Sequence, residues 1–143
     1  MSIQQISVFL ENRAGQLAEL TQLLADNLVD IRAISIAETT DYGLARMIVD
    51  DCERTSKVLR DSGAVMSVTP VWAVEVPDKP AGLATLLSVL SQNEISVAYM
   101  YSLFTHRDDT AYMVLRVEDE EKFIAAMKKS GMKIMTADQL GLK

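Results

Sequence analysis

The chain has little of what most active sites and disulfide frameworks need. Its 143 residues include one cysteine, one histidine, one tryptophan and three prolines. A single cysteine cannot form an internal disulfide. One histidine and one cysteine are too few for the ligand sets of protein zinc sites, and no glycine-rich loop of the P-loop type occurs. We therefore expect neither a metal nor a cofactor.

Long apolar runs and clusters of basic residues are also missing. No stretch reaches the roughly 18 apolar residues of a membrane helix, and the first residues lack the charged and apolar segments of a signal peptide. The formal net charge is −6, so the backbone of a nucleic acid would be repelled on average. An aromatic-rich strand motif of the RNA-binding type is absent too. We expect a cytoplasmic protein that binds neither nucleic acid nor membrane.

What the sequence does contain is a repeat. The segment 11–36 returns in weaker form as 78–102, and the numbers of the matched residues differ by 66. Later in the chain Gly63 matches Gly131, which indicates two additional residues in the second copy before its second helix. A fixed internal period indicates one structural unit used twice. The matched pairs are Leu17 and Leu83, Ala18 and Ala84, Leu20 and Leu86, Leu24 and Leu90, Asn27 and Asn93, and Ile31 and Val97.

Hydrophobic periodicity predicts the same order of elements in both copies: strand, helix, strand, strand, helix, strand. Turns are expected at 11–15, 39–43, 77–81 and 106–109, and Asn27 is expected as a left-handed helix cap. The first copy is predicted to have strands at 6–10, 31–37, 44–49 and 64–68 and helices at 16–27 and from 50 to Gly63. The second is predicted to have strands at 71–76, 97–104, 111–117 and 132–136 and helices at 82–93 and 120–130.

This order predicts an α+β fold of two ferredoxin-like βαββαβ repeats, at 1–70 and 71–143. Each would form an antiparallel sheet with both helices on one face. No flexible linker separates the repeats, so we expect them to be docked. Several strands carry neighbouring apolar residues, which either predict a second covered face or edge, by the sister repeat or another chain, or are ordinary half-exposed side chains. These pairs are Val8 and Phe9, Met47 and Ile48, and Met113 and Val114.

The turn before the first helix is the candidate binding feature. Backbone amides at a helix start point outward and attract a carboxylate or phosphate. Gly15 permits close approach of a ligand or a left-handed turn, and Asn12 adds hydrogen-bonding groups. Alternatively, these two residues only form and cap the turn.

The run Asn12-Arg13-Ala14-Gly15-Gln16-Leu17, the Leu-rich helix and Asp30-Ile31 resemble the ACT domain, the amino-acid-sensing module of metabolic enzymes and regulators. The run 78–83 resembles its second copy. The family motif is short and degenerate, and its recurrence with matching flanks over nearly the whole chain carries the resemblance. It implies units that pair sheet edge to sheet edge. It also implies a free amino acid bound between the turn of one unit and the second-strand start of its neighbour.

The resemblance further implies roles for individual residues. Asn12 would be the polar turn residue, the amides of Gly15 to Leu17 would hold the ligand carboxylate, and Asp30 would hold its ammonium group. Asp78, Ala81 and Ser96 take these places in the second copy, with Gly82 expected to keep some backbone freedom beside Ala81. Ser96 is a weaker polar anchor than Asp30, and Ala14 replaces the usual proline that Pro80 retains. Because of these differences between the copies, the sites are expected to be unequal. The implied ligand-binding residues are Asn12, Ala14, Gly15, Gln16, Leu17, Asp30, Ile31, Asp78, Ala81, Gly82, Leu83, Ser96 and Val97.

Candidate catalytic residues are few. His106 falls in a predicted turn, where a solvated side chain is favoured over a general base, and Cys52 at a helix start is favoured as an inert thiol. We expect a non-catalytic regulatory protein with a free amino acid as effector, a homodimer through sheet edges or faces, and a regulated partner protein. The alternatives are a ligand-free dimerisation module serving a metabolic enzyme or transcriptional regulator, and, least favoured, a small enzyme on the same scaffold.

Overall fold

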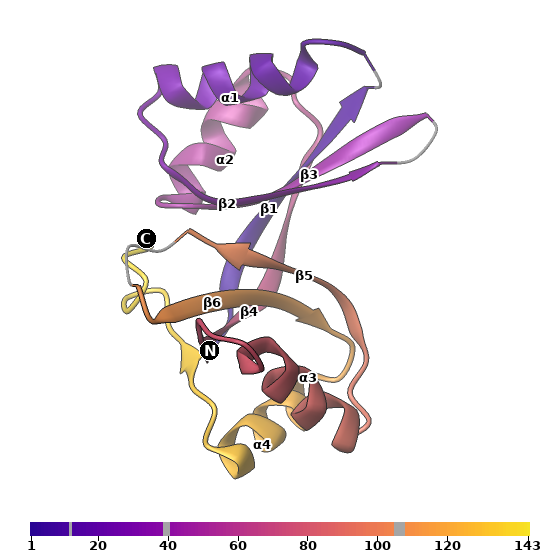
Figure 1. The fold of residues 1–143 in the computed structure, drawn as a ribbon. Coiled ribbons are helices and arrows are strands. Elements are labelled where there is room, and N and C mark those ends of the chain that lie inside the picture. Colours follow the sequence, from indigo (N-terminus) through magenta and orange to yellow (C-terminus); the bar gives the residue numbers. More distant parts are fainter. Residues whose placement is uncertain (12, 39–40, 105–107) are drawn as a thin grey trace. The chain divides into compact units, whose positions relative to one another are not determined.

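The computed structural model describes residues 1–11, 13–38, 41–104 and 108–143. The predicted order of strands and helices is confirmed (Figure 1). The elements are β1 (Ile3–Glu11), α1 (Gln16–Asp26), β2 (Ile31–Glu38), β3 (Tyr42–Val49), α2 (Cys52–Asp61), β4 (Met66–Pro77), α3 (Gly82–Gln92), β5 (Val97–Leu103), β6 (Thr110–Val117), α4 (Glu120–Ser130) and β7 (Ile134–Met135).

The strands differ from the prediction in three places. The strands expected at 64–68 and 71–76 form one strand, β4, because Pro70 has the extended backbone of a strand and lacks only an amide hydrogen. Tyr42 and Gly43 belong to β3 rather than to a turn, since they pair with Glu11 and Leu10. The last predicted strand, at 132–136, is reduced to two residues that pair with β4.

The chain forms two compact units, and each includes a few residues from the far end of the sequence. The N-terminal unit comprises Gln4–Thr69 and Gly141–Lys143, and the C-terminal unit comprises Pro70–Leu140 and Met1–Ile3. The last residue is held at the start of α2. Its amide donates to the carbonyl of Asp50 (2.8 Å) and its carbonyl accepts from the amide of Cys52 (3.4 Å). The predicted domain limits, 1–70 and 71–143, stay a prediction.

In the N-terminal unit, β3 pairs antiparallel with β1 on one side and β2 on the other. The residues after α2 continue the sheet beside β1, where the amide of Phe9 donates to the carbonyl of Val65 (2.9 Å). Both helices cover one face (Figure 1), because their apolar side chains join the same core. That core contains Ile6, Val8, Leu10, Leu20, Leu24, Val29, Ala45, Met47, Val49, Cys52 and Leu59.

The C-terminal unit repeats this arrangement. β6 pairs antiparallel with β4 and β5, and β4 pairs antiparallel with β7. Trp72 lies in its core with its ring 5.6 Å from that of Phe123. Each unit is therefore a four-stranded antiparallel sheet with two helices, which confirms the α+β, ferredoxin-like prediction. The core contains Trp72, Val74, Val76, Leu86, Leu90, Ile95, Leu115, Val117, Phe123, Ala126 and Met127.

The neighbouring apolar residues on the strands differ in how deeply they are buried. Met47 and Ile48 are both fully buried, although they point to opposite faces of β3. Phe9, in contrast, keeps 42% of its surface exposed and stacks on the ring of Tyr42 at 4.7 Å. Phe9 thus fits the prediction of an ordinary half-exposed side chain.

Helix ends show the repeat most directly. The prediction that Asn27 is left-handed is wrong, because its φ is −100° and the next residue, Leu28, takes φ of +58°. Asn27 instead donates from Nδ2 to the carbonyl of Leu23 (2.9 Å). Asn93 and Glu94 repeat this arrangement at the end of α3, where Glu94 has φ of +55°.

The starts of the second helices confirm the change of offset from 66 to 68. Asp51 accepts a hydrogen bond from the amide of Arg54, and Asp119 accepts one from the amide of Lys122. These side chains satisfy amides that have no partner inside the helix. Gly63 and Gly131 follow the same helices with φ of 84° and 74°.

Replacing Leu28 with glycine is expected to stabilise the N-terminal unit. The side chain is 82% exposed, so little packing is lost, while the left-handed conformation disfavours any residue with a Cβ. We expect Leu28→Gly to raise the free energy of unfolding by about 1 kcal/mol, measured by urea denaturation. Ala18→Gly, at an exposed position inside α1, is the control and should lower it by about 1 kcal/mol. A loss of stability in both variants would contradict the strain argument.

Candidate functional site

The two predicted binding turns have the same backbone geometry. The residue before each first helix is left-handed: Gly15 has φ of 88° and ψ of −11°, and Ala81 has φ of 76° and ψ of −7°. Each carbonyl accepts a bond from the helix amide four residues on, from Glu19 and from Thr85 (both 2.9 Å). In the described part of the chain, neither Gly15 nor Ala81 caps its helix with a side chain, and helix-start amides that have no other acceptor attract an anion.

Gly82 has a different role from the one expected. It does not compensate for Ala81, because Ala81 itself takes the left-handed conformation. Glycine is needed at 82 for space, since a Cβ there would overlap the carbonyl oxygen of Pro77. The amide of Gly82 also donates to the carbonyl of Lys79 (3.0 Å). For the amide of Gln16, its counterpart in the first turn, no acceptor is found among the described residues, which do not include Asn12.

Asp30 lies at the other end of α1 from this turn. Its amide donates to Oδ1 of Asp50 (3.0 Å), and its carbonyl accepts from the amide of Asp50 (3.0 Å). The exposed carboxylate of Asp30 has no partner in the described part of the chain. Since α1 has 11 residues, about 16 Å separates its ends. A small ligand therefore cannot contact both Gly15 and Asp30 of one unit.

The remaining predicted residues lie where the repeat places them. Ser96 is exposed before β5, as Asp30 is before β2. Ile31 pairs with Val49, and Val97 pairs with Val117, with the same irregularity of register following each. Ala14 and Asp78 are exposed, and the amide of Asp78 donates to the carbonyl of Asp109 (2.9 Å). Leu17 and Leu83 keep 40% and 42% of their surface exposed.

Two of the residues that sequence analysis singled out lie outside the described residues. They are Asn12, the predicted polar residue of the first turn, and His106, the predicted turn histidine. Thr39 and Thr40 of the predicted turn at 39–43 lie outside them as well. The roles assigned to these residues stay predictions.

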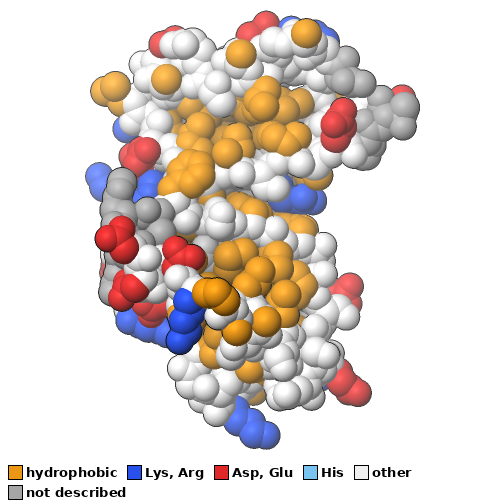
Figure 2. All heavy atoms as spheres, viewed as in Figure 1, with side chains coloured by type: hydrophobic (Ala, Val, Ile, Leu, Met, Phe, Trp, Pro, Cys, Tyr) orange, Lys and Arg blue, Asp and Glu red, His pale blue; other side chains and the backbone are white. Residues whose placement is uncertain are grey.

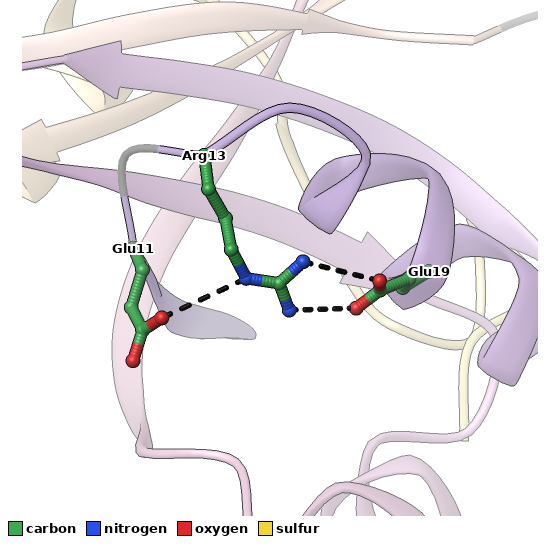
Figure 3. Close-up of polar contacts among 3 residues, drawn as sticks. All are labelled: Glu11, Arg13 and Glu19. Atoms are coloured by element: carbon green, nitrogen blue, oxygen red, sulfur yellow. Dashed lines mark hydrogen bonds and ion pairs between the residues drawn. The ribbon is translucent and has the colours of Figure 1, made fainter.

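A charge cluster at the first turn, formed by Glu11, Arg13 and Glu19, was not predicted (Figure 3). The Arg13 guanidinium donates two hydrogen bonds to the carboxylate of Glu19 (3.1 and 2.9 Å), and its Nε lies 3.7 Å from the carboxylate of Glu11. Hydrogen bonding to Arg13 lowers the pKa of Glu19, and the same bond raises the pKa of Arg13. The sequence signal that could have predicted this cluster is a basic residue, Arg13, before the helix start and an acidic residue, Glu19, in the first turn of the helix.

The second turn has no counterpart of this cluster. Pro77, Lys79 and Thr85 occupy the equivalent positions. The hydroxyl of Thr85 donates to the carbonyl of Ala81 (2.8 Å) and so stays within its own turn. The two turns share a backbone conformation but differ in charge.

Other reactive features are limited in the described residues. Cys52 is buried, and this burial raises the pKa of its thiol, which favours the protonated, unreactive form at neutral pH. The described part of the chain brings together no group of three or more His, Cys, Asp and Glu side chains that could hold a metal ion. None of its helices is both long enough and apolar enough to span a membrane.

Comparison with known proteins defines the class. Residues 1–140 match the family described as an ACT domain pair. With two ferredoxin-like units and the same turn before the first helix of each, the chain belongs to this family of paired ACT domains. A search of the curated proteins returned no match.

Solved structures agree with this assignment. Protein BT0572 from Bacteroides thetaiotaomicron is 34% identical, with a TM-score of 0.90 over 99% of this chain and 96% of that one. The ligand-free regulatory subunit of aspartate kinase from Thermus thermophilus is 14% identical, with a TM-score of 0.63 over 87% and 90% of the two chains. The corresponding subunit from Thermus flavus, also 14% identical, has a TM-score of 0.61 over 88% and 90%. The two Thermus structures show a shared fold.

Opposite substitutions at adjacent positions test the geometry of the second turn. Ala81→Gly should raise the free energy of unfolding by about 1 kcal/mol, because it removes a Cβ from a left-handed residue. Gly82→Ala should lower it by about 3 kcal/mol, because the new Cβ overlaps the Pro77 carbonyl. Urea denaturation measures both. A neutral result for Gly82→Ala would contradict the close approach of the two backbones.

The charge cluster predicts a pH-dependent contribution to stability. Because the folded state lowers the pKa of Glu19, its contribution is present at pH values above the ordinary glutamate pKa and is lost as the pH falls through the lower value of the folded state. Glu19→Gln should therefore destabilise the protein slightly at pH 7 and should have no effect at pH 2. The control is Arg13→Gln, which should cause the same loss at pH 7 without adding to it in the double variant. Equal effects of Glu19→Gln at both pH values would contradict the ion pair as the cause.

Proposed function

We propose that the protein is a non-catalytic regulatory protein that binds a free amino acid at the helix start formed by Gly15, Gln16 and Leu17. The observation that carries the proposal is the left-handed residue before the first helix of both units, for which no side-chain cap is found among the described residues. Such a turn directs backbone amides and the positive end of the helix dipole at the carboxylate that every amino acid carries.

The ammonium group needs a second contact, and Asp30 is the strongest candidate in the chain. A carboxylate holds an ammonium group through a charge-assisted hydrogen bond, whereas the hydroxyl of Ser96 forms a weaker neutral bond. The stronger amide site and the stronger ammonium site both belong to the N-terminal unit, at opposite ends of α1. A second copy of the chain is therefore required to bring Gly15 of one protomer close to Asp30 of the other.

Ligand binding would then be coupled to assembly. A ligand held between two units stabilises the arrangement in which it makes both contacts, and this differential affinity shifts the equilibrium. We propose that the protein is a cytoplasmic homodimer that passes the amino-acid signal to a partner protein. The fold that it shares with regulatory subunits of aspartate kinase supports a regulatory role.

A ligand-free dimerisation module is the second candidate. The observation in its favour is the number of large apolar side chains that keep more than a third of their surface exposed, which include Phe9, Ile36 and Tyr42 in the N-terminal unit and Leu87 and Phe104 in the C-terminal unit. Figure 2 shows apolar side chains gathered on the viewed face of each unit. Exposed apolar patches often mark protein interfaces.

A thermal-shift screen of the purified protein against the twenty amino acids separates these two functions. A ligand that binds only the native state stabilises it by about 2.7 kcal/mol at a hundred times its dissociation constant. We expect one amino acid, or one chemically related group, to raise the melting temperature, with calorimetry giving the affinity. Twenty unchanged melting curves from folded protein would contradict the sensor and favour the dimerisation module.

The contributions of the two copies can be ranked by mutation. Asp30→Ala should weaken binding of the amino acid identified in the screen by about tenfold or more, because it removes a charge-assisted contact of about 1.5 kcal/mol or more. Ser96→Ala should weaken it less. Asp26→Ala, which removes another exposed carboxylate near the end of α1, is the matched control and should leave the affinity unchanged. Equal losses in the variants of Asp30 and Ser96, measured by calorimetry, would contradict the ranking.

A further inference from the structure

The four helices in the described part of the chain end in the same backbone motif. One left-handed residue follows each helix, and the amide of the next residue donates to the carbonyl five residues earlier. Glycine is the usual residue at the left-handed position, because it has no Cβ to oppose that conformation. The chain has glycine there after α2 and α4 but not after α1 and α3. The four left-handed residues are Leu28, Gly63, Glu94 and Gly131.

Leu28 is the least favourable residue of this set. A leucine at φ of +58° is strained, and 82% of its surface is exposed, so the unit gains little packing in return. Glu94 has the same conformation in the second copy but presents a charged side chain to water. A strained residue that its own fold does not need points to a function.

Leu28 lies beside the proposed ammonium contact. Asp30 follows two residues later, and Val29 between them is buried in the core of the unit. Val29 therefore anchors the segment, while both of its neighbours stay exposed. Because consecutive Cα atoms are about 3.8 Å apart, those of Leu28 and Asp30 are separated by at most about 7 Å. The Leu28 side chain is thus within reach of a ligand whose ammonium group Asp30 holds.

The charged side chains near Asp30 in the sequence are already engaged. Those within four residues are Asp26 and Arg32. Oδ1 of Asp26 accepts a hydrogen bond from Nε2 of Gln22 (2.8 Å), and Arg32 also has a partner. The large exposed side chain that remains in this segment is the apolar one of Leu28.

The other half of the proposed site, the start of α1, also presents an exposed leucine. Leu17 keeps 40% of its surface exposed, and its amide is among those proposed to hold the ligand carboxylate. The charged side chains within four residues of the helix start are Glu11, Arg13 and Glu19, and Arg13 pairs with both carboxylates (Figure 3). In the described residues, the apolar surface of Leu17 is therefore what this half presents to a ligand side chain.

From the strain and exposure of Leu28, the exposed Leu17 and the pairing of the charges around them, we propose that the effector is an aliphatic amino acid. The proposal rests on the amino-acid site proposed above. The ammonium and carboxylate groups of an amino acid share one α-carbon, so Asp30 of one protomer and the helix start of the other hold that carbon between them. The ligand side chain begins at the same carbon and packs on Leu28 of the first protomer and Leu17 of the second.

The C-terminal unit keeps only one of these three features. Leu83, the counterpart of Leu17, is 42% exposed, but Glu94 replaces Leu28 and Ser96 replaces Asp30. A charged side chain at 94 would lose hydration on contact with an aliphatic ligand. The aliphatic preference therefore belongs to the N-terminal unit.

Two pairs of amino acids with similar shapes test the class on the intact protein. Valine has a methyl group where threonine has a hydroxyl, and leucine has two methyl groups where asparagine has an amide. We expect thermal shift and calorimetry to show that the tightest ligand among all twenty amino acids is aliphatic, and that valine or leucine binds about tenfold or more tightly than its polar analogue. Tightest binding of a polar, charged or aromatic amino acid would overturn the aliphatic class and leave the amino-acid site standing. No shift with any of the twenty would overturn both.

Leu28→Asn separates the ligand contact from the fold. Asparagine has a similar size and tolerates a left-handed backbone better than leucine, so the melting temperature without ligand should not fall. The affinity for the aliphatic amino acid that binds most tightly should fall about tenfold or more, because the apolar contact is lost. Glu94→Asn changes the equivalent left-handed residue of the second copy and is the matched control, which should keep the original affinity. Unchanged affinity in Leu28→Asn, or an equal loss in Glu94→Asn, would overturn the role of Leu28.

Discussion

The structure of each unit depends on the burial of one helix against one face of a sheet. Leu24 of α1 and Leu90 of α3 are almost completely excluded from water, and each joins the core that the strands and the second helix complete. This packing fixes where the helix begins and ends. The positions of the left-handed residue at its start and of Asp30 or Ser96 beyond its end are then fixed relative to each other. The candidate ligand contacts are therefore set by the core and not by the loops alone.

The fold could be predicted from sequence because it depends on local periodicity and on repetition. Each of the signals used lies within a few residues of sequence. They are the spacing of Leu17, Leu20 and Leu24, the alternation in the strands, and the stop signals at Gly63 and Gly131. Asn27 was assigned wrongly because asparagine is favoured both in left-handed positions and as a donor to the preceding helix turn. The geometry of the helix end assigns the left-handed position to Leu28.

The candidate site was harder to predict, because its properties depend on contacts that no local pattern records. The need for glycine at 82 arises from the Pro77 carbonyl, which the chain brings close only when the turn is folded. The pairing of Arg13 with Glu19 spans the start of α1. Asn12 and His106 lie outside the described residues, so the structure does not test their predicted roles. Duplication preserved the backbone of the two turns, whereas the side chains around them diverged.

The exchange of terminal residues between the units has a consequence for biosynthesis. Residues 141–143 complete the N-terminal unit, and residues 1–3 complete the C-terminal unit. During translation the N-terminal repeat therefore leaves the ribosome before its last contacts, at Asp50 and Cys52, have been synthesised. Its final packing must wait until almost the entire second repeat has emerged. Completion of the N-terminal unit therefore depends on synthesis of the second repeat.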